Sequence, residues 1–291
     1  MRFFLSLVCI CLSLSAKTQV NMDDISERLS YYGDVMVSAL EYNHREYASS
    51  QFYNDFIELL DSTNLYNASL DNLRTISVID EDAGRFRLLS WQLEKAAFEF
   101  EYHAFLVWPD GTYVEFKQTR SPDKSIQYME LKPDNWYGAL YYNLVAFDKD
   151  TYLLFGYNGY GQYDHIKIAD VLRVQGENIV LGKEVFEDRK DKGMFNNRIL
   201  LKYSSDAAVN LNYNPGLKMI VMDHLMPRMG KQEGQGPTMI PDGTYEGFEM
   251  LEGKWKYISK LYNHSYGENN APRPKPVFDD NKDKNLFGKK N

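Results

Sequence analysis

The stretch AFEFEYHAFLVWPDGTYVEF, residues 97–116, decides the fold class. Up to residue 108, one face carries alternate apolar or aromatic residues: Phe98, Phe100, Tyr102, Ala104, Leu106 and Trp108. Glu99, Glu101 and His103 fall on the other face. Because side chains of a strand alternate between its two faces, the pattern predicts a half-buried strand that folds back at residues 109–111.

The register of that hairpin follows from the same pattern. A three-residue loop pairs Leu106 with Val114 and keeps the apolar faces together, whereas a two-residue loop would set Leu106 opposite Glu115. Proline at the first loop position and glycine in a left-handed conformation at the third also suit three residues. We therefore expect a three-residue loop with Gly111 at positive φ.

The same tripeptide recurs in PDGTYEGF, which begins at Pro241, 132 positions after Pro109. We expect a second three-residue hairpin loop there, with Gly243 at positive φ. A turn that is used twice needs no shared ligand, although an ancient duplication would leave the same pattern.

Turn residues divide the rest of the chain into short strands. Further hairpin turns are predicted at residues 148–150, 214–216 and 252–253. The segments RILLKY, at 198–203, and LKMIVM, at 217–222, are apolar on both faces, which is typical of central strands covered on two sides. Residues 67–266 are therefore expected to form an antiparallel β domain, either a β-sandwich or propeller-like meanders.

Before this domain, apolar residues recur at helical spacing. The pattern predicts two helices within residues 17–66, with Ser49 or Ser50 as the N-cap of the second. The expected fold class is mainly β with a small N-terminal helical part, an α+β protein.

Both ends of the chain differ in composition from this domain. The first 16 residues have a positive start, an apolar run and small residues up to Ala16, which is typical of a secretory signal peptide. Both cysteines lie in that leader, so a mature chain of about 275 residues would contain no disulfide or cysteine nucleophile. Residues 267–291 are rich in proline and charge and are predicted to be a disordered tail. Its Phe278 and Phe287 could anchor a partner, although a tail without any role has the same composition.

Composition also limits the class of partner. The formal net charge of -8, without a dense basic stripe, disfavours nucleic acid. No apolar run after the leader reaches membrane-spanning length, so no transmembrane segment is expected in the mature chain. Nucleotide-binding, zinc and serine-nucleophile motifs are missing, so we predict no cofactor, no metal and no catalytic residue.

The glycine-rich stretch FGYNGYGQYDH, from residue 155, is the strongest candidate for a binding loop. Tyr157, Tyr160 and Tyr163 could stack on sugar rings or on a peptide, and Asn158 could add hydrogen bonds. The alternative, which we favour, is a plain connection whose tyrosines cover the edge of a sheet.

Charged residues offer weaker candidates. The aspartate–histidine neighbours at 164–165 and 223–224 should point to opposite faces of a strand, so strand ends are a better interpretation than metal sites. Glu99 and Glu101 share a face at about 7 Å, a spacing compatible with glycoside hydrolysis. A solvated sheet face gives the same pattern more often.

The segments DNWYGALYYNLVAF, YLLFGYNG and GTYEGFEMLEGKWKY resemble a family of uncharacterised exported proteins found in the Bacteroidota, over the middle and C-terminal half of the chain. The resemblance implies an envelope location and transfers no active site. We therefore expect a non-catalytic exported protein of the periplasm or outer membrane that binds or assembles with other envelope proteins. The alternative is a carbohydrate-binding module or a glycan-acting hydrolase, with glycan as the partner.

Overall fold

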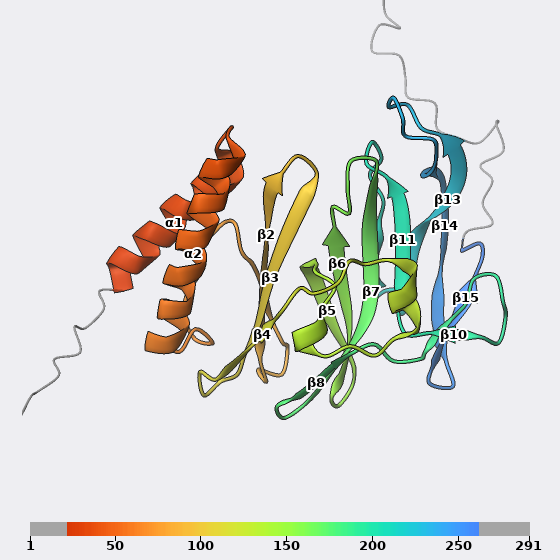
Figure 1. Ribbon diagram of the computed structural model, residues 1–291. Coiled ribbons are helices and arrows are strands. Elements are labelled where there is room, and N and C mark those ends of the chain that lie inside the picture. The colour runs from red at the N-terminus through yellow and green to blue at the C-terminus, as the bar shows by residue number, and fades with distance from the viewer. Residues whose placement is uncertain (1–21, 262–291) are drawn as a thin grey trace, which may run out of the picture.

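The computed structural model describes residues 22–261, and these stack in four layers (Figure 1). Two helices form the first layer and three mainly antiparallel sheets follow, face to face as in a sandwich. The predicted mainly β, α+β class is therefore confirmed. The expected signal peptide and the tail with Phe278 and Phe287 lie outside the described residues.

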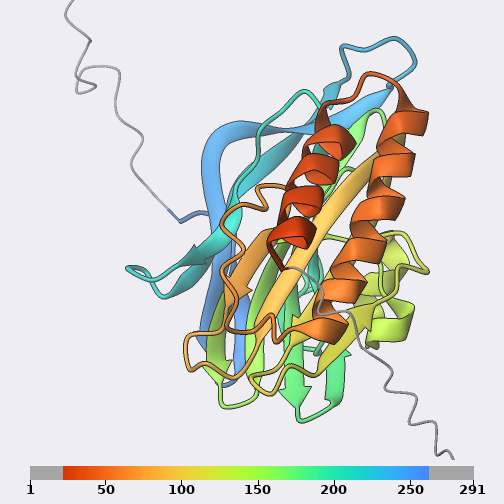
Figure 2. The ribbon, with the colours of Figure 1, turned by 90° about the vertical axis from the view of Figure 1, so that its left-hand side faces the viewer.

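The helices α1 (Met22–Ser38) and α2 (Tyr42–Ser62) lie side by side over one face of the first sheet (Figure 2). Phe56 of α2 contacts Trp91 of that sheet edge to face, with ring centroids 4.9 Å apart. Ser49 and Ser50 lie inside α2, so the predicted cap was wrong. The helix begins earlier because residues 42–48 continue its helical repeat as far as the buried Ala48.

The first sheet has the order β1-β2-β3-β4. Its strands are β1 (Ser77–Asp80), β2 (Arg87–Ala96), β3 (Glu99–Val107) and β4 (Tyr113–Phe116). Leu106 pairs with Val114 as predicted, and Gly111 has φ +87° in the loop. Strand β3 is not half-buried, however, because Phe105 and Val107 on its expected polar face pack beneath the helices.

The second sheet has the order β11-β7-β6-β5, with β8 also paired to β7. Its strands are β5 (Leu140–Asp148), β6 (Thr151–Asn158), β7 (Asp164–Gln175), β8 (Asn178–Leu181) and β11 (Ile199–Ser204). Leu154 packs toward the first sheet and Leu153 toward the third. The prediction that residues 198–203 form a central strand was wrong, because β11 lies at the edge of this sheet. The neighbouring layers bury both faces of β11, so the segment is apolar on both faces even though no strand pairs with its second edge among the described residues.

The third sheet has the order β10-β9-β15-β14-β13-β12. Its strands are β9 (Phe186–Glu187), β10 (Phe195–Asn196), β12 (Leu211–Asn214), β13 (Met219–Met229), β14 (Pro237–Leu251) and β15 (Lys254–Ile258). The expected hairpin loop at 241–243 was wrong, because these residues lie inside β14. Between the pairs Asp223–Tyr245 and Leu225–Pro241, β13 contains a single residue and β14 contains 242–244, so the segment is a bulge.

The other predicted turns lie where the sequence places them. Residues 148–150, 214–216 and 252–253 fall at the β5–β6, β12–β13 and β14–β15 connections. Two short 3₁₀ helices, η1 (Lys124–Tyr128) and η2 (Pro133–Asn135), lie in the connection from β4 to β5. No helix within residues 22–261 combines the length and apolar character needed to cross a membrane.

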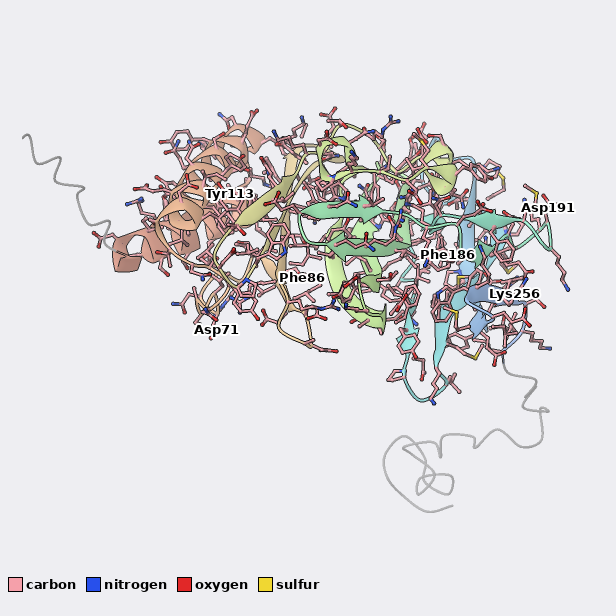
Figure 3. All side chains as sticks on the ribbon, turned by 90° about the horizontal axis from the view of Figure 1, so that it is seen from below. Asp71, Phe86, Tyr113, Phe186, Asp191 and Lys256 are labelled. Carbon is pink, nitrogen blue, oxygen red and sulfur yellow. The ribbon has the colours of Figure 1, made fainter. Side chains whose placement is uncertain are left out.

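Side chains fill the spaces between the layers (Figure 3). Phe86 belongs to the core between the first and second sheets, and Phe186 to the core between the second and third. A separate core joins the helices to the first sheet. Each sheet is thus packed against a neighbouring layer.

Candidate functional site

Among the described residues, β11 pairs with another strand along only one of its two edges. The Ser205 N–H donates to the carbonyl of Tyr163. Since hydrogen-bonded pairs alternate along an antiparallel ladder, Leu201 must direct its peptide groups to β7. Leu200 and Lys202 then direct their N–H and C=O groups the other way. Within residues 22–261, neither has a backbone partner on that side.

The free edge opens into a cleft of about 470 Å³ between the second and third sheets, which we name the edge cleft. Phe186 and Phe248, both buried, line its apolar part. Tyr128, at the end of η1, and Tyr160 line it as exposed side chains, with 56% and 40% of their surface accessible. The cleft therefore combines a bare strand edge with two accessible aromatic rings.

Charged groups that line the edge cleft are mostly paired within the protein. The pairs are Arg189 with Glu246, Lys202 with Asp164, and Arg198 with Asp170. The carboxylates of Asp123 and Asp188 accept backbone N–H groups instead. The cleft thus has no strong excess of one charge, so peptide groups and aromatic rings dominate what it offers.

The open part of the β11 edge is short because neighbouring segments cover both of its ends. At the start, Asn197 N–H donates to the carbonyl of Gln127 over 2.7 Å and ties η1 to the strand. At the end, Gln235 Nε2, from the connection between β13 and β14, donates to Oγ of Ser204, the last residue of β11, over 3.0 Å. The accessible edge is therefore centred on Leu200 to Lys202.

Of the four predicted loop residues, Tyr160 lies in the edge cleft. It has a left-handed backbone, φ +52°, and the Lys202 ammonium lies 4.7 Å from its ring centroid. Asn158 is buried and structural: its Nδ2 donates to the carbonyl of Gly138, and its Oδ1 accepts the Tyr160 N–H. Asn158 therefore holds the turn that presents Tyr160.

The other two loop tyrosines lie elsewhere. Tyr163 donates its hydroxyl to the carbonyl of Glu233 over 2.9 Å and so anchors the connection between β13 and β14. Tyr157 is half-buried on the face of the second sheet that packs toward the third, where its ring meets His165 edge to face at 5.3 Å. The structure does not bring these two tyrosines together with Tyr160 in one cleft.

Sequence reasoning missed Tyr128 and the β11 edge. One signal was present: a lysine in an otherwise apolar strand is a common mark of an edge, and Lys202 interrupts RILLKY in this way. Tyr128 had no comparable signal, because it is separated from Tyr160 by 32 positions and reaches the cleft through the fold alone.

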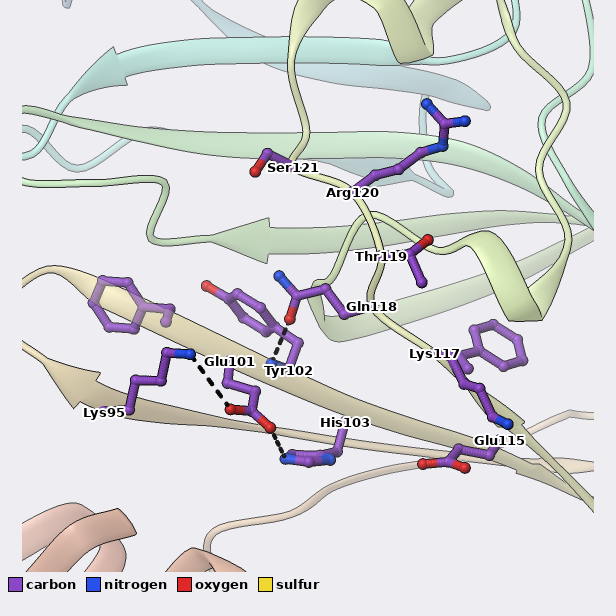
Figure 4. A pocket seen from close by; sticks show the side chains of 12 residues that line it. Lys95, Glu101, Tyr102, His103, Glu115, Lys117, Gln118, Thr119, Arg120 and Ser121 are labelled. Carbon is purple, nitrogen blue, oxygen red and sulfur yellow. Dashed lines mark hydrogen bonds and ion pairs between the residues drawn. The ribbon is translucent and has the colours of Figure 1, made fainter. Parts of the chain in front are cut away.

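A second cleft of about 590 Å³ lies on the first sheet, and we name it the polar cleft (Figure 4). Its central imidazole, His103, stacks on Trp91 with centroids 5.0 Å apart. His103 Nε2 lies 3.4 Å from Glu101 Oε1 but has no hydrogen-bond partner. Burial lowers the pKa of His103, while the carboxylates of Glu101 and Glu115 oppose that shift.

The predicted carboxylate pair takes a different form there. Glu101 lines the polar cleft together with Glu115 of β4, whereas Glu99 does not line it. Each of the two carboxylates already has a partner within the protein: Lys95 lies 3.9 Å from Glu101, and Tyr53 donates its hydroxyl to Glu115 over 2.8 Å. Apart from Phe100, the residues that line this cleft offer no accessible aromatic ring on which a sugar could stack.

The aspartate–histidine neighbours have separate partners. Asp223 accepts the N–H of Asn210, whereas His224 Nδ1 lies 2.8 Å from Asp242 Oδ2 in the bulge of β14. His165 contacts tyrosine rings and not its neighbour. Within residues 22–261, no group of three or more histidine, cysteine or acidic side chains is arranged to hold a metal ion.

Comparison with known proteins adds no relative: no family model matches the chain, and neither a curated protein nor a solved structure matches it significantly. Function is therefore inferred from the geometry of the two clefts and from the sequence.

Proposed function

We propose that the protein is a non-catalytic binding protein of the cell envelope, and that it captures an extended segment of a partner protein by strand addition at β11. The expected signal peptide and the resemblance to exported proteins support the location. The observation that carries the binding proposal is the outward direction of the peptide groups of Leu200 and Lys202 in the edge cleft.

Strand addition suits this geometry for two reasons. Main-chain groups of an edge strand bond any extended peptide, and pockets for alternate side chains then select its sequence. Leu200 and Lys202 supply donors and acceptors in the spacing of an antiparallel or parallel ladder. Tyr128 and Tyr160, whose rings are exposed, supply apolar surface on which side chains of the incoming segment can pack, and the buried Phe186 and Phe248 lie beneath the cleft.

A glycan-acting function has less support. It would use Glu101 and Glu115 in the polar cleft, but both carboxylates already contact donors of the protein. The ring that stacks on His103, Trp91, is fully buried and so cannot stack on a sugar. We therefore keep a carbohydrate-binding or hydrolytic role as the alternative and protein binding as the proposal.

A proline substitution tests the proposal at the level of one N–H group. A random-peptide display library is selected on the full chain, and the selected peptides are titrated against Lys202→Pro and Lys202→Ala. Proline removes an N–H that bonds nothing within the described chain, so β11 should stay paired to β7. We expect Lys202→Pro to weaken binding about tenfold or more, and Lys202→Ala, which keeps the N–H, to weaken it about threefold or less.

The neighbouring residue provides the matched control. Leu201→Pro removes an N–H that bonds β7, so it should destabilise the protein, whereas Lys202→Pro should keep its thermal midpoint. The proposal fails if the selected peptides bind Lys202→Pro as tightly as Lys202→Ala. It also fails if the library yields no peptide that protects the Leu200 and Lys202 amides from hydrogen exchange.

A further inference from the structure

Lys167 is a half-buried lysine without an acidic partner among the described residues. It lies on β7, opposite Tyr157 of β6, on the face that packs toward the third sheet. Its ammonium lies 4.2 Å from the ring centroid of Tyr142 and 5.7 Å from that of Tyr157. Lysines are seldom buried without an acidic partner, so the position of Lys167 has to be explained by something other than a salt bridge within the described residues.

Strand register gathers further polar groups around this lysine. His165 lies two residues before Lys167 and therefore on the same face of the sheet. Tyr203 of β11 is the cross-strand partner of His165. The ring of His165 meets Tyr157 at 5.3 Å and Tyr203 at 5.9 Å, both edge to face. Three adjacent strands thus bring one ammonium, one imidazole and two phenols to one end of the sheet face.

Within residues 22–261, the polar ends of this cluster have no hydrogen-bond partner. Among the described residues, none accepts a hydrogen bond from Lys167, His165 or the hydroxyls of Tyr157 and Tyr203. None of these groups is sealed from solvent as an unpaired polar atom either. Asp164, the nearest acid to His165, is occupied by Lys202 and Thr238. Hydrogen-bond donors therefore outnumber the acceptors that face them.

We propose that Lys167, His165, Tyr157 and Tyr203 form a binding site for an oxyanion, a carboxylate or a phosphate group. An anion would supply the missing counter-charge of the lysine and accept hydrogen bonds from the phenols. Burial raises the pKa of Tyr157 and of Tyr203 to about 12, which keeps both hydroxyls protonated as donors at neutral pH. This site is separate from the edge cleft and does not depend on peptide binding there.

Calorimetric titration of the full chain tests the site with two probes, inorganic phosphate and acetate, at constant ionic strength. We expect saturable binding of at least one anion, and the tighter of the two indicates whether the natural group is a phosphate or a carboxylate. Lys167→Met should weaken that binding about tenfold or more, because it removes the charge and keeps the length of the side chain. Tyr157→Phe, which removes one donor, should weaken it about threefold.

Lys256→Met is the matched control, because Lys256 also lies over an aromatic ring, that of Phe195, but is paired with Glu187. It should leave anion binding within about twofold of the wild-type value, since exposed paired lysines add little. The inference is overturned if neither anion gives saturable binding, or if Lys167→Met binds as well as the wild type. An equal loss in Lys256→Met overturns it too. So does a lower thermal midpoint of Lys167→Met than of the wild type when both are measured without anion, because the lysine would then be structural.

Discussion

Arg198 donates from Nε to the carboxylate of Asp170 over 2.8 Å, and neither side chain is exposed to solvent. The same guanidinium also donates to the carbonyls of Ile126 and Leu181. It therefore joins the start of β11 to η1 and β8, and its position sets one end of the edge cleft.

Removing one partner of this buried pair should cost more than removing both. Asp170→Leu leaves a buried guanidinium without its counter-charge, so we expect a loss of about 3–5 kcal/mol in the free energy of unfolding. The double variant Asp170→Leu with Arg198→Met should recover a large part of that loss. Urea denaturation of the three proteins measures it, and equal losses in the single and double variants would contradict this account.

Stability should fall at mildly acidic pH because of His103. Burial holds its pKa below the ordinary 6.5, so the unfolded chain binds more protons as the pH falls below that value. The stability contributed by neutral His103 is present above pH 6.5 and is lost as the pH falls through its folded pKa. His103→Gln should flatten the dependence of the urea midpoint between about pH 7.5 and 5.

Part of that dependence should remain in His103→Gln, because burial lowers the pKa of His165 in the same direction. The acids with lowered pKa values titrate below this window and do not interfere with it. A slope that is unchanged by His103→Gln would show that His103 is not responsible.

The two Pro-Asp-Gly glycines should differ in their tolerance of alanine. Both have positive φ, +87° at Gly111 and +85° at Gly243, so each substitution should cost about 1 kcal/mol from backbone strain. A Cβ at Gly111 would also lie 3.3 Å from Cβ of Asn64, whereas one at Gly243 meets no atom within 4 Å. Thermal denaturation should therefore rank Gly111→Ala as the more destabilising variant, and the reverse order would contradict the structure.

Thr244 should control the titration of Asp242. Its hydroxyl and backbone N–H, together with His224, hold the pKa of Asp242 at about 2. Thr244→Val removes the hydroxyl donor, so the pKa measured by NMR should rise toward the ordinary 3.8. A carboxylate whose pKa is lowered in the folded protein stabilises the fold at pH values above its unfolded pKa, and this stability is lost as the pH falls. The variant, whose pKa is lowered less, should therefore lose less stability than the wild type between about pH 4 and 2. An unchanged pKa would rule out the bond.

Local sequence was sufficient for features that depend on neighbouring residues. Alternation and turn chemistry predicted β3, its loop and its register with β4, because a three-residue loop sets Leu106 opposite Val114. The same chemistry recurs at Asp242 and Thr244, whose hydrogen bonds copy those of Asp110 and Thr112. The two segments nevertheless differ in structure. The first closes the hairpin between β3 and β4, whereas the second forms a bulge inside β14, because only the second has a continuous partner strand, β13.

The candidate site could be predicted in part only. The glycine-rich loop pointed to Tyr160, which does line the edge cleft, but it equally pointed to Tyr157 and Tyr163, which lie elsewhere. Their difference arises from which strand or turn each tyrosine occupies after the second and third sheets pack together.

The sequence by itself determined the α+β class, the helical start, most hairpin turns and the positive φ of Gly111 and Gly243, since each depends on interactions within a few residues. Only the tertiary structure decided that three sheets stack, that β11 is an edge and that Lys167 has no counter-charge among the described residues. These features depend on which faces and edges meet across long separations in the chain. An apolar pattern records that a face is buried, but it does not record what covers that face or whether the strand has a neighbour at its edge.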